Sequence, residues 1–216
     1  MRGPRGAGLR AEGPWYGSAM GRVATRSQLT APEYLAWERE QSDRHEFHDG
    51  EVFARSGGSP RHSLLAGNVV AELKRTLGDR CFTLTSDQRV AFDEGRRYVY
   101  PDATVVCGAF ELQAGTSDTL ANPSAIVEVL SASTEAYDRG LKWEIYQRLA
   151  SLTDYLLVSQ REVRVEHFRR APDRGWLYTA HGAGEHVALS NGASLAVDAI
   201  YARAFELPAD DAAGPR

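Results

Sequence analysis

Two short runs of apolar and β-branched residues each carry one acidic residue. The first is YPDATVVCG, residues 100–108, with Asp102, and the second is PSAIVEVLS, residues 123–131, with Glu128. Such runs are typical of buried strands. Because a carboxylate inside an apolar strand costs free energy unless it is paired, the sequence predicts two neighbouring core strands that each hold a partnered carboxylate.

An antiparallel pairing of these two strands brings the two carboxylates together. A register centred on the long linker sets residue 107 against residue 123 and Asp102 opposite Glu128. Directly opposed side chains have Cβ atoms about 4.5–5.5 Å apart, where two like charges repel each other. A divalent cation between them, separate ion pairs with Arg or Lys, or a raised pKa of one acid would each remove the repulsion. The residues alone leave these three alternatives open.

Amphipathic helices and hairpins surround the two strands. In the segment 59–78, apolar residues recur at every fourth position between a Ser-Pro start and a terminal glycine, which is typical of a helix packed on a core. The order of elements predicts the α/β (α+β) class, with a mixed central β-sheet flanked by α-helices. Helices are predicted over 30–40, 59–78 and 133–150, strands over 80–92, 98–108 and 124–130, and hairpins over 44–56, turning at Asp49-Gly50, and 154–170.

Length and composition predict one domain with a tail at each end. The chain has 216 residues, which suits a single domain. Residues 1–28 are basic, rich in Gly and Ala and without helix or strand periodicity, so they are predicted to be a disordered tail, in which Met20 is an alternative start. The domain is predicted over 29–207, and residues 208–216 are predicted to be a C-terminal tail.

The charge and the cysteine content of the chain limit which classes of partner and which cellular compartment are expected. The net charge of -4 argues against a protein that coats nucleic acid without specificity, because such proteins are usually basic. No apolar run reaches the roughly 18–20 residues of a membrane span, so no membrane partner is expected. Cys81 and Cys107 show no metal-ligand spacing and are predicted to be buried free thiols, which fits a reducing cytoplasm.

Lys142 is the third residue with a chemical role to consider. Asp138 precedes it by four residues, which predicts an ordinary helical ion pair. Lys142 also borders the apolar face of its helix and lies on the helix that leaves the Glu128 strand. A lysine that reaches back toward the two carboxylates would stabilise negative charge building up on a phosphate. Both roles remain open at this point.

Several segments taken together resemble the Uma-two family of bacterial proteins, described as "putative restriction endonucleases" within the PD-(D/E)xK nuclease superfamily. They are HEFHDGEVFARSGGSPRHSLLAGNV, SDQRV, YVYPDATVVC, IVEVLSASTEAYDRGLKWEIYQRLASLTDYLLVSQ and RVEHFRR, and the resemblance covers residues 29 to 207 in order. In this resemblance Asp102 is the superfamily aspartate and Glu128 is the second acid. Leu130 stands where the superfamily lysine usually lies, and Lys142 on the following helix takes its role.

The resemblance also marks three further positions. Glu46 is similar to an upstream acid of the family and would be a further metal ligand, while His62 and Asp87 match recurrent positions of unassigned role. Taken by themselves, these residues also suit an ion pair, a packed histidine and a turn. Arg164, Arg169 and Arg170 in RVEHFRR would suit either a basic patch or the solvated face of a hairpin.

What the resemblance implies is a restriction-endonuclease-like fold and a Mg²⁺-dependent endodeoxyribonuclease, with Mn²⁺ as a substitute. Asp102, Glu128 and Glu46 would hold the metal, and Lys142 and His62 would complete the catalytic set. The expected substrate is the phosphodiester bond of nucleic acid, DNA first, and a homodimer would serve duplex cleavage. The alternative is a nucleic-acid-binding or interaction protein with a vestigial nuclease site.

Overall fold

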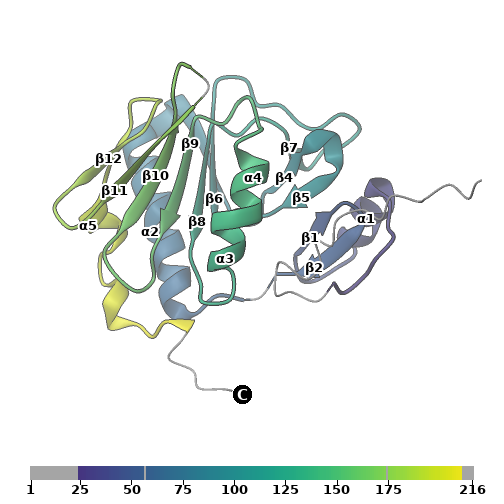
Figure 1. Ribbon diagram of the computed structural model, residues 1–216, viewed down its shortest axis with the longest axis horizontal. Coiled ribbons are helices and arrows are strands. Elements are labelled where there is room, and N and C mark those ends of the chain that lie inside the picture. Colours follow the sequence, from purple (N-terminus) through teal and green to yellow (C-terminus); the bar gives the residue numbers. More distant parts are fainter. Residues whose placement is uncertain (1–23, 56, 174, 211–216) are drawn as a thin grey trace, which may run out of the picture.

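Two β-sheets, joined through the segment 100–102, form the frame of the molecule (Figure 1). The computed structural model describes residues 24–55, 57–173 and 175–210. The predicted N-terminal tail lies outside the described residues up to position 23, and its end, residues 24–28, runs beside strand β2, where Arg26 pairs with Val52. Residues 211–216 of the predicted C-terminal tail also lie outside. Mixed sheets flanked by helices confirm the predicted fold class.

The larger sheet is mixed and has the strand order β11-β10-β9-β8-β6-β3. Its one parallel pair, β8 with β9, is connected by helical segments that cross one face of the sheet, and its other neighbours are antiparallel. The strands are β3 (Cys81–Thr85), β6 (Ala103–Cys107), β8 (Ala125–Val129), β9 (Asp154–Val158), β10 (Val165–Arg170) and β11 (Trp176–His181).

The smaller sheet has the order β2-β1-β5-β4-β7 and is covered by the first helix, α1 (Ala31–Glu38). Thr30 and Glu33 close a reciprocal capping box at the start of α1. The predicted hairpin turns at Asp49 and Gly50, both of which have positive φ angles, 47° and 103°. The strands are β1 (His45–His48), β2 (Glu51–Ala54), β4 (Arg89–Phe92), β5 (Arg97–Val99) and β7 (Thr119–Leu120).

The run predicted as one strand over 98–108 is divided between the two sheets. Strand β5 ends at Val99 in the smaller sheet, and strand β6 begins at Ala103 in the larger one. Pro101 lies in the break, and because proline has no N–H to donate, it cannot continue a ladder of hydrogen bonds. Asp102 therefore stands at the junction of the two sheets, directly before β6.

Helix α2 (Pro60–Leu77) covers one face of the larger sheet, as predicted for 59–78. The Ser59 hydroxyl accepts a hydrogen bond from the His62 N–H, Pro60 stands at the first position, and Gly78 ends the helix with a φ of 54°. The apolar stripe packs on the odd-numbered residues of β6 and β8. This places the first turn of α2 beside the start of β6.

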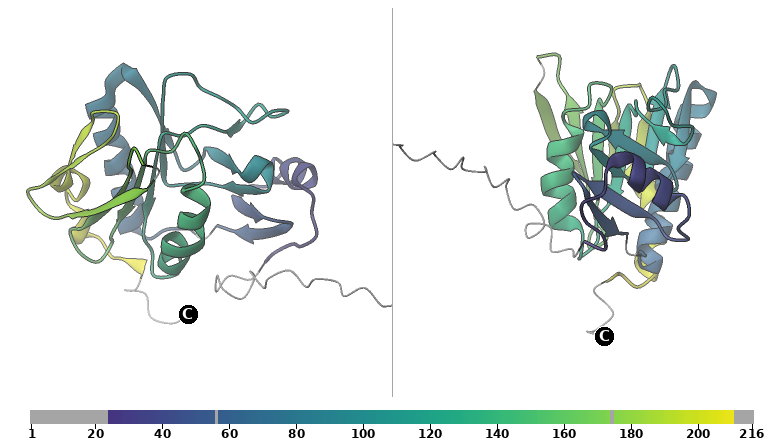
Figure 2. Two further views of the ribbon diagram at one scale, coloured as in Figure 1. Left: turned by 45° about the horizontal axis from the view of Figure 1, so that its top comes forward. Right: turned by 90° about the vertical axis from the view of Figure 1, so that its right-hand side faces the viewer.

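The opposite face of the larger sheet carries the helix predicted over 133–150, which is shorter than predicted and interrupted by a π-helical turn, and is called the broken helix below. It consists of α3 (Glu135–Tyr137), the π-helical turn η3 (Asp138–Lys142) and α4 (Trp143–Tyr146). Just beyond its end, the carbonyl groups of Gln147 and Leu149 accept hydrogen bonds from the Arg170 side chain at 3.0 and 2.8 Å, which satisfies them outside a helical ladder. Figure 2 shows α2 and α4 on opposite sides of the strands.

Short elements complete the fold. Strands β12 (His186–Ala188) and β13 (Ser194–Ala196) and helix α5 (Val197–Ile200) pack against the α2 side. Three single turns of 3-10 helix are η1 (Gly78–Arg80), η2 (Asp93–Gly95) and η4 (Ala204–Glu206). No helix in the described part of the chain is long and apolar enough to cross a membrane.

The pairing of β6 with β8 has the predicted register. Ala103 lies opposite Val127 and Val105 opposite Ala125, so the same register places Asp102 opposite Glu128. Side chains alternate between the faces of a strand. Because the odd-numbered residues pack against α2, Asp102 and Glu128 belong to the face that carries the broken helix.

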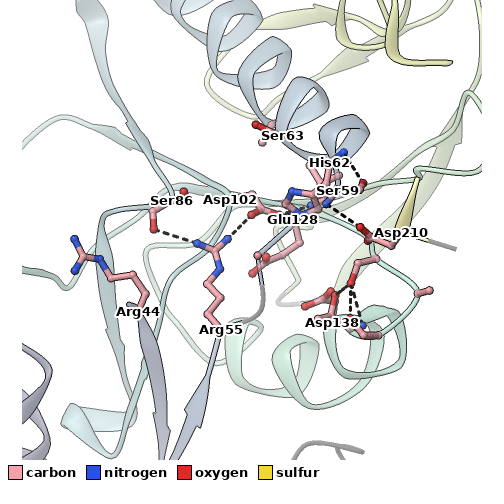
Figure 3. A pocket seen from close by; sticks show the side chains of 18 of the residues that line it. Arg44, Arg55, Ser59, His62, Ser63, Ser86, Asp102, Glu128, Asp138 and Asp210 are labelled. Carbon is pink, nitrogen blue, oxygen red and sulfur yellow. Dashed lines mark hydrogen bonds and ion pairs between the residues drawn. The ribbon is translucent and has the colours of Figure 1, made fainter. Parts of the chain in front are cut away.

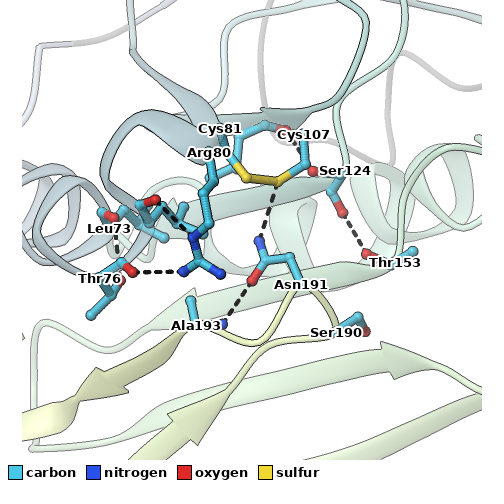
Figure 4. The surroundings of a disulfide bond; sticks show 12 residues. Leu73, Thr76, Arg80, Cys81, Cys107, Ser124, Thr153, Ser190, Asn191 and Ala193 are labelled. Carbon is cyan, nitrogen blue, oxygen red and sulfur yellow. Dashed lines mark hydrogen bonds between the residues drawn. A yellow bond between two sulfur atoms is a disulfide. The ribbon is translucent and has the colours of Figure 1, made fainter.

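The prediction of free thiols at Cys81 and Cys107 is wrong. The two cysteines lie directly opposite each other on the antiparallel strands β3 and β6 and form a disulfide bond (Figure 4). The Asn191 side chain contacts Cys107 Sγ at 3.6 Å. Opposed positions bring two Cβ atoms to a distance that a disulfide can bridge. The bond ties the edge strand β3 to the strand that follows Asp102.

Reduction of this disulfide is expected to destabilise the folded state by about 3–4 kcal/mol, because the bond closes a loop between cysteines 26 residues apart and so restricts the unfolded chain. The measurement is urea unfolding with and without dithiothreitol. The double variant Cys81→Ser, Cys107→Ser is the control, and its stability should not respond to dithiothreitol. An equal response of both proteins would contradict the assignment.

Candidate active site

A cleft of about 1320 Å³ opens where the two sheets and both helical layers meet (Figure 3). The β1–β2 hairpin contributes one wall, the first turn of α2 another, and the broken helix a third. The floor is formed at the start of β6 and the end of β8. The cleft is lined by every residue predicted for the catalytic set, namely Glu46, His62, Asp102, Glu128 and Lys142.

Asp102 is buried in the floor of the cleft and has three donors around it. Its Oδ1 atom forms an ion pair with Arg55, while Oδ2 accepts the Val129 N–H at 2.7 Å and lies 3.3 Å from His62 Nε2. Burial by itself raises the pKa of Asp102, but the hydrogen bond and charge of His62, the charge of Arg55 and the Val129 N–H outweigh it and hold the pKa below its ordinary value. Asp102 is therefore an ionised carboxylate.

Glu128 is held at its Oε1 atom. Its Oε1 atom accepts hydrogen bonds from Lys142 Nζ at 3.0 Å and from the Tyr146 hydroxyl at 2.7 Å. Burial raises the pKa of Glu128 to about 8, even though the charge of Lys142 lowers it. Tyr146 follows Lys142 by one helical turn, so the same face of the broken helix fixes Oε1 with two donors.

Lys142 is buried among three carboxylates. Its Nζ atom lies 3.0 Å from Glu128 Oε1, 3.0 Å from Asp138 Oδ1 and 3.5 Å from Glu46 Oε1. Burial by itself lowers the pKa of Lys142, but the charges of Asp138 and Glu128 outweigh it and raise the pKa well above its ordinary value. Lys142 forms the predicted ion pair with Asp138 and also reaches Glu128, while its role toward a phosphate stays a prediction.

The π-helical turn η3 supplies both members of the Asp138–Lys142 pair to the cleft. Each side chain is almost fully buried, at 2% and 5% exposed. Lys142 Nζ also lies 5.2 Å from the centre of the Tyr137 ring, which lines the cleft. A π turn in a helix is often found at a functional site. Here the π turn contributes Asp138 and Lys142 to the carboxylate cluster.

Glu46 and His62 enter the cleft from opposite sides. Glu46 lies on β1, is 2% exposed and contacts Lys142. His62 lies in the first turn of α2, and its contact with Asp102 raises its pKa although burial lowers it. The structure thus gathers all five predicted residues from β1, α2, the start of β6, β8 and the broken helix.

The other candidates lie elsewhere. The Asp87 side chain is 81% exposed and lies 3.7 Å from Arg44, outside the lining of the cleft. Arg164 donates hydrogen bonds to Glu166 and to the Tyr178 hydroxyl, and Arg170 donates to backbone carbonyl groups. These arginines belong to the β10–β11 side of the large sheet and hold neighbouring elements.

Two residues that contact the carboxylates of the site were not predicted from the sequence: Arg55, which lines the cleft, and Tyr146, which is fully buried and donates to Glu128. Arg55 lies directly after β2 and pairs through its backbone with Arg44 across the hairpin. Alternation along the hairpin puts Arg44 and Glu46 on the same face, and the cross-strand position of Arg55 shares that face. That pattern is a signal for both arginines. Tyr146 could have been found from its spacing of four residues after Lys142.

The acidic residues of the cleft suit a metal that keeps water and substrate in its coordination shell. Among the described residues, no three His, Cys, Asp or Glu side chains are arranged as a ready metal cage. Asp102 and Glu128 offer carboxylate oxygens, and Mg²⁺ is commonly bound by one or two carboxylates together with water and substrate phosphates. The donor chemistry of this pair therefore fits Mg²⁺, with Glu46 close to the same cluster.

Comparison with known proteins gives matches over most of the chain. A family model described as "Uma2: Putative restriction endonuclease" matches residues 31–202. The uncharacterised protein slr1290 of Synechocystis sp. is 36% identical over 176 residues, which is 81% of this chain and 92% of the relative. The uncharacterised protein sll1609 of the same organism is 37% identical over 158 residues, 73% of this chain and 89% of the relative.

A solved structure shares the fold. It is described as a "putative nuclease belonging to DUF820" from Anabaena variabilis, has a TM-score of 0.62 and 16% sequence identity, and covers 82% of this chain and 99% of its own. The predicted restriction-endonuclease-like fold, a mixed sheet flanked by helices, is confirmed. The family description and this neighbour support a nuclease function in general.

Replacing the buried cation tests the charge balance of the cleft. In the Lys142→Met variant three buried carboxylates lose their cation, so the free energy of unfolding should fall by about 3–5 kcal/mol at about pH 8. Without the cation, the folded-state pKa values of Glu128 and Asp138, which burial already raises, lie further above the unfolded values, so the folded state binds extra protons. Stability is therefore lost as pH rises, and the deficit should be smaller at about pH 5.

The measurement is urea unfolding at both pH values. Lys74→Met is the matched control, since Lys74 is the chain's other lysine and is exposed on α2. The control should stay within about 0.5 kcal/mol of the wild type at both pH values. A Lys142→Met deficit that did not depend on pH would show that the carboxylates do not rely on Lys142.

Proposed function

The chain belongs to the Uma2 (Uma-two) family, and from this premise we propose that it is a divalent-metal-dependent endonuclease that hydrolyses phosphodiester bonds of DNA. Family membership confirms the resemblance seen in the sequence. The general nuclease function comes with the family, and the DNA substrate and the metal are part of the proposal.

One observation carries the proposal most strongly. Asp102 and Glu128 lie opposite each other at the junction of two sheets, and Lys142 contacts Glu128 in the same cleft. Two acids and a lysine in one cleft are the groups that phosphodiester hydrolysis needs: anions to bind a metal, and a fixed cation to offset charge on the phosphate. Salt bridging alone does not require a cleft that could admit a nucleic-acid strand.

In the proposed mechanism Asp102 and Glu128 would hold Mg²⁺, for which Mn²⁺ could substitute, and Glu46 would assist. When bound, the metal supplies a Lewis acid that stabilises charge on phosphate oxygens and lowers the pKa of water. Tyr146 and Lys142 keep Glu128 Oε1 in place, so Oε2 is the oxygen left for a ligand. The Val129 N–H and His62 likewise keep Asp102 Oδ2 in place, so Oδ1 is the oxygen of Asp102 left for a ligand.

Lys142 acts in this mechanism as a fixed cation. The carboxylates of Glu128, Asp138 and Glu46 keep it protonated, so its positive charge offsets the negative charge that builds up on a phosphate oxygen. A water in line with the leaving oxygen attacks phosphorus, the bond from phosphorus to the 3′ oxygen breaks, and the product carries a 5′-phosphate. The attacking water releases one proton to solvent, and the leaving oxygen takes one up from solvent, so the protons balance.

A cytoplasmic location is part of the proposal, because DNA is the substrate. The Cys81–Cys107 disulfide argues in the other direction, since disulfides are rare in a reducing cytoplasm. The reduction experiment on that bond therefore also shows how the fold would fare in a reducing compartment.

A homodimer on the duplex is a further part of the proposal, since cutting both strands takes two phosphodiester bonds and one cleft serves one bond at a time. Sedimentation velocity in the presence of duplex DNA should show two copies of the chain per duplex. A complex with one copy that still breaks both strands would contradict this part.

The metal ligands are tested by calorimetry and cleavage together. Wild type should bind Mg²⁺ and Mn²⁺ and nick a supercoiled plasmid, while Asp102→Ala and Glu128→Ala should each lose metal affinity and at least about a hundredfold in cleavage rate. Asp79→Ala is the control, because Asp79 is exposed beyond the end of α2. It should behave as wild type in both measurements.

Two results would sink the proposal. Wild type that takes up no divalent cation, even with DNA present, would make Asp102 and Glu128 structural residues. Wild type that binds DNA and metal without cutting would support the alternative of a binding protein with a vestigial site. Circular dichroism of each variant shows whether a loss of activity follows from unfolding.

A further inference from the structure

Arg55 forms an ion pair with the oxygen of Asp102 that a metal would need. In the described part of the chain, Asp102 Oδ2 is occupied by the Val129 N–H at 2.7 Å and by His62 at 3.3 Å, whereas Oδ1 contacts the Arg55 guanidinium (Figure 3). The backbone N–H of Val129 cannot leave without breaking the end of β8. Oδ1 is therefore the atom at which a cation can bind, and a side-chain cation already occupies it.

The Arg55 side chain makes few contacts, whereas its backbone is tied to the hairpin. Its N–H donates to the Arg44 carbonyl at 2.9 Å, which continues the β1–β2 ladder by one pair. The side chain is 24% exposed and lines the cleft, and its other contact is a long hydrogen bond of 3.3 Å to the Ser86 carbonyl. Turning this side chain into the cleft costs one ion pair and one weak hydrogen bond.

We propose that Arg55 exchanges partners during the reaction: it holds Asp102 in the metal-free cleft, and once Asp102 Oδ1 binds a divalent cation it binds a backbone phosphate of the nucleic acid. This rests on the proposed metal-dependent nuclease function. Arginine suits the second partner, because its planar group offers several donors in a fork that matches phosphate oxygens.

The exchange has a thermodynamic consequence. Without nucleic acid, Arg55 and the metal compete for one carboxylate oxygen, so Arg55 weakens metal binding. With nucleic acid, the displaced guanidinium gains a phosphate partner, so the two ligands favour each other's binding. Such coupling is reciprocal: the factor by which DNA tightens the metal equals the factor by which the metal tightens DNA.

The test removes Arg55 and measures the two affinities separately. For Arg55→Gln, calorimetry with Mn²⁺ and no nucleic acid should show about tenfold tighter metal binding than wild type, equivalent to about 1.4 kcal/mol. Fluorescence anisotropy with a labelled DNA duplex, in Ca²⁺ to suppress turnover, should show about tenfold weaker DNA binding. Loss of a merely structural contact would not move the two affinities in opposite directions.

Arg44→Gln is the matched control, since Arg44 is the cross-strand neighbour of Arg55 and lines the same cleft without touching Asp102. It should leave Mn²⁺ affinity unchanged. Arg55→Lys is a second variant, which keeps the charge but loses the forked set of guanidinium donors. Its Mn²⁺ affinity should stay nearer to that of wild type, while its affinity for the DNA duplex should still fall.

The outcomes separate this inference from the function on which it rests. If wild type binds Mn²⁺ and Arg55→Gln weakens both metal and DNA, or leaves DNA binding unchanged, the exchange is overturned and the nuclease proposal stands. If wild type binds no Mn²⁺, the nuclease proposal falls and the exchange falls with it. Opposite shifts in Arg55→Gln, absent in Arg44→Gln, support the exchange.

Discussion

The burial of several carboxylates around one lysine is the constraint on which the rest of the cleft depends. Glu46, Glu128 and Asp138 are almost fully buried, and Lys142 lies within 3.5 Å of all three. Buried charges of one sign are tolerated only when an opposite charge is held among them. The hairpin, the central strand and the broken helix must therefore stay together, because each contributes part of this cluster.

The junction between the two sheets places Asp102 and an open cleft beside this buried cluster. Pro101 ends one ladder of hydrogen bonds, and Asp102 follows it at the first point where the chain has left one sheet and entered the other. The cleft lies at that point because no strand fills it. The two neighbouring residues thus differ in their effect: Pro101 ends the strand pairing beside the cleft, and Asp102 lines the cleft.

Local patterns were sufficient to predict the centre of the site. The register that sets Asp102 against Glu128 follows from two short runs and their linker, and the helix that carries Lys142 follows from its periodicity. The disulfide was not predicted, because Cys81 and Cys107 meet only through the pairing of β3 with β6, for which no register had been predicted. The same holds for the early end of the broken helix, where the capping group comes from Arg170, more than twenty residues later.

The bond between Cys81 and Cys107 clamps strand β6 at the end opposite to Asp102. A strand that slips by one residue turns every side chain to the other face of its sheet. Such a slip would turn Asp102 away from Glu128. Because β3 is covalently joined to β6, the edge strand β3 would have to slip as well. The disulfide, although far from the cleft, therefore opposes a shift in register that would misplace Asp102.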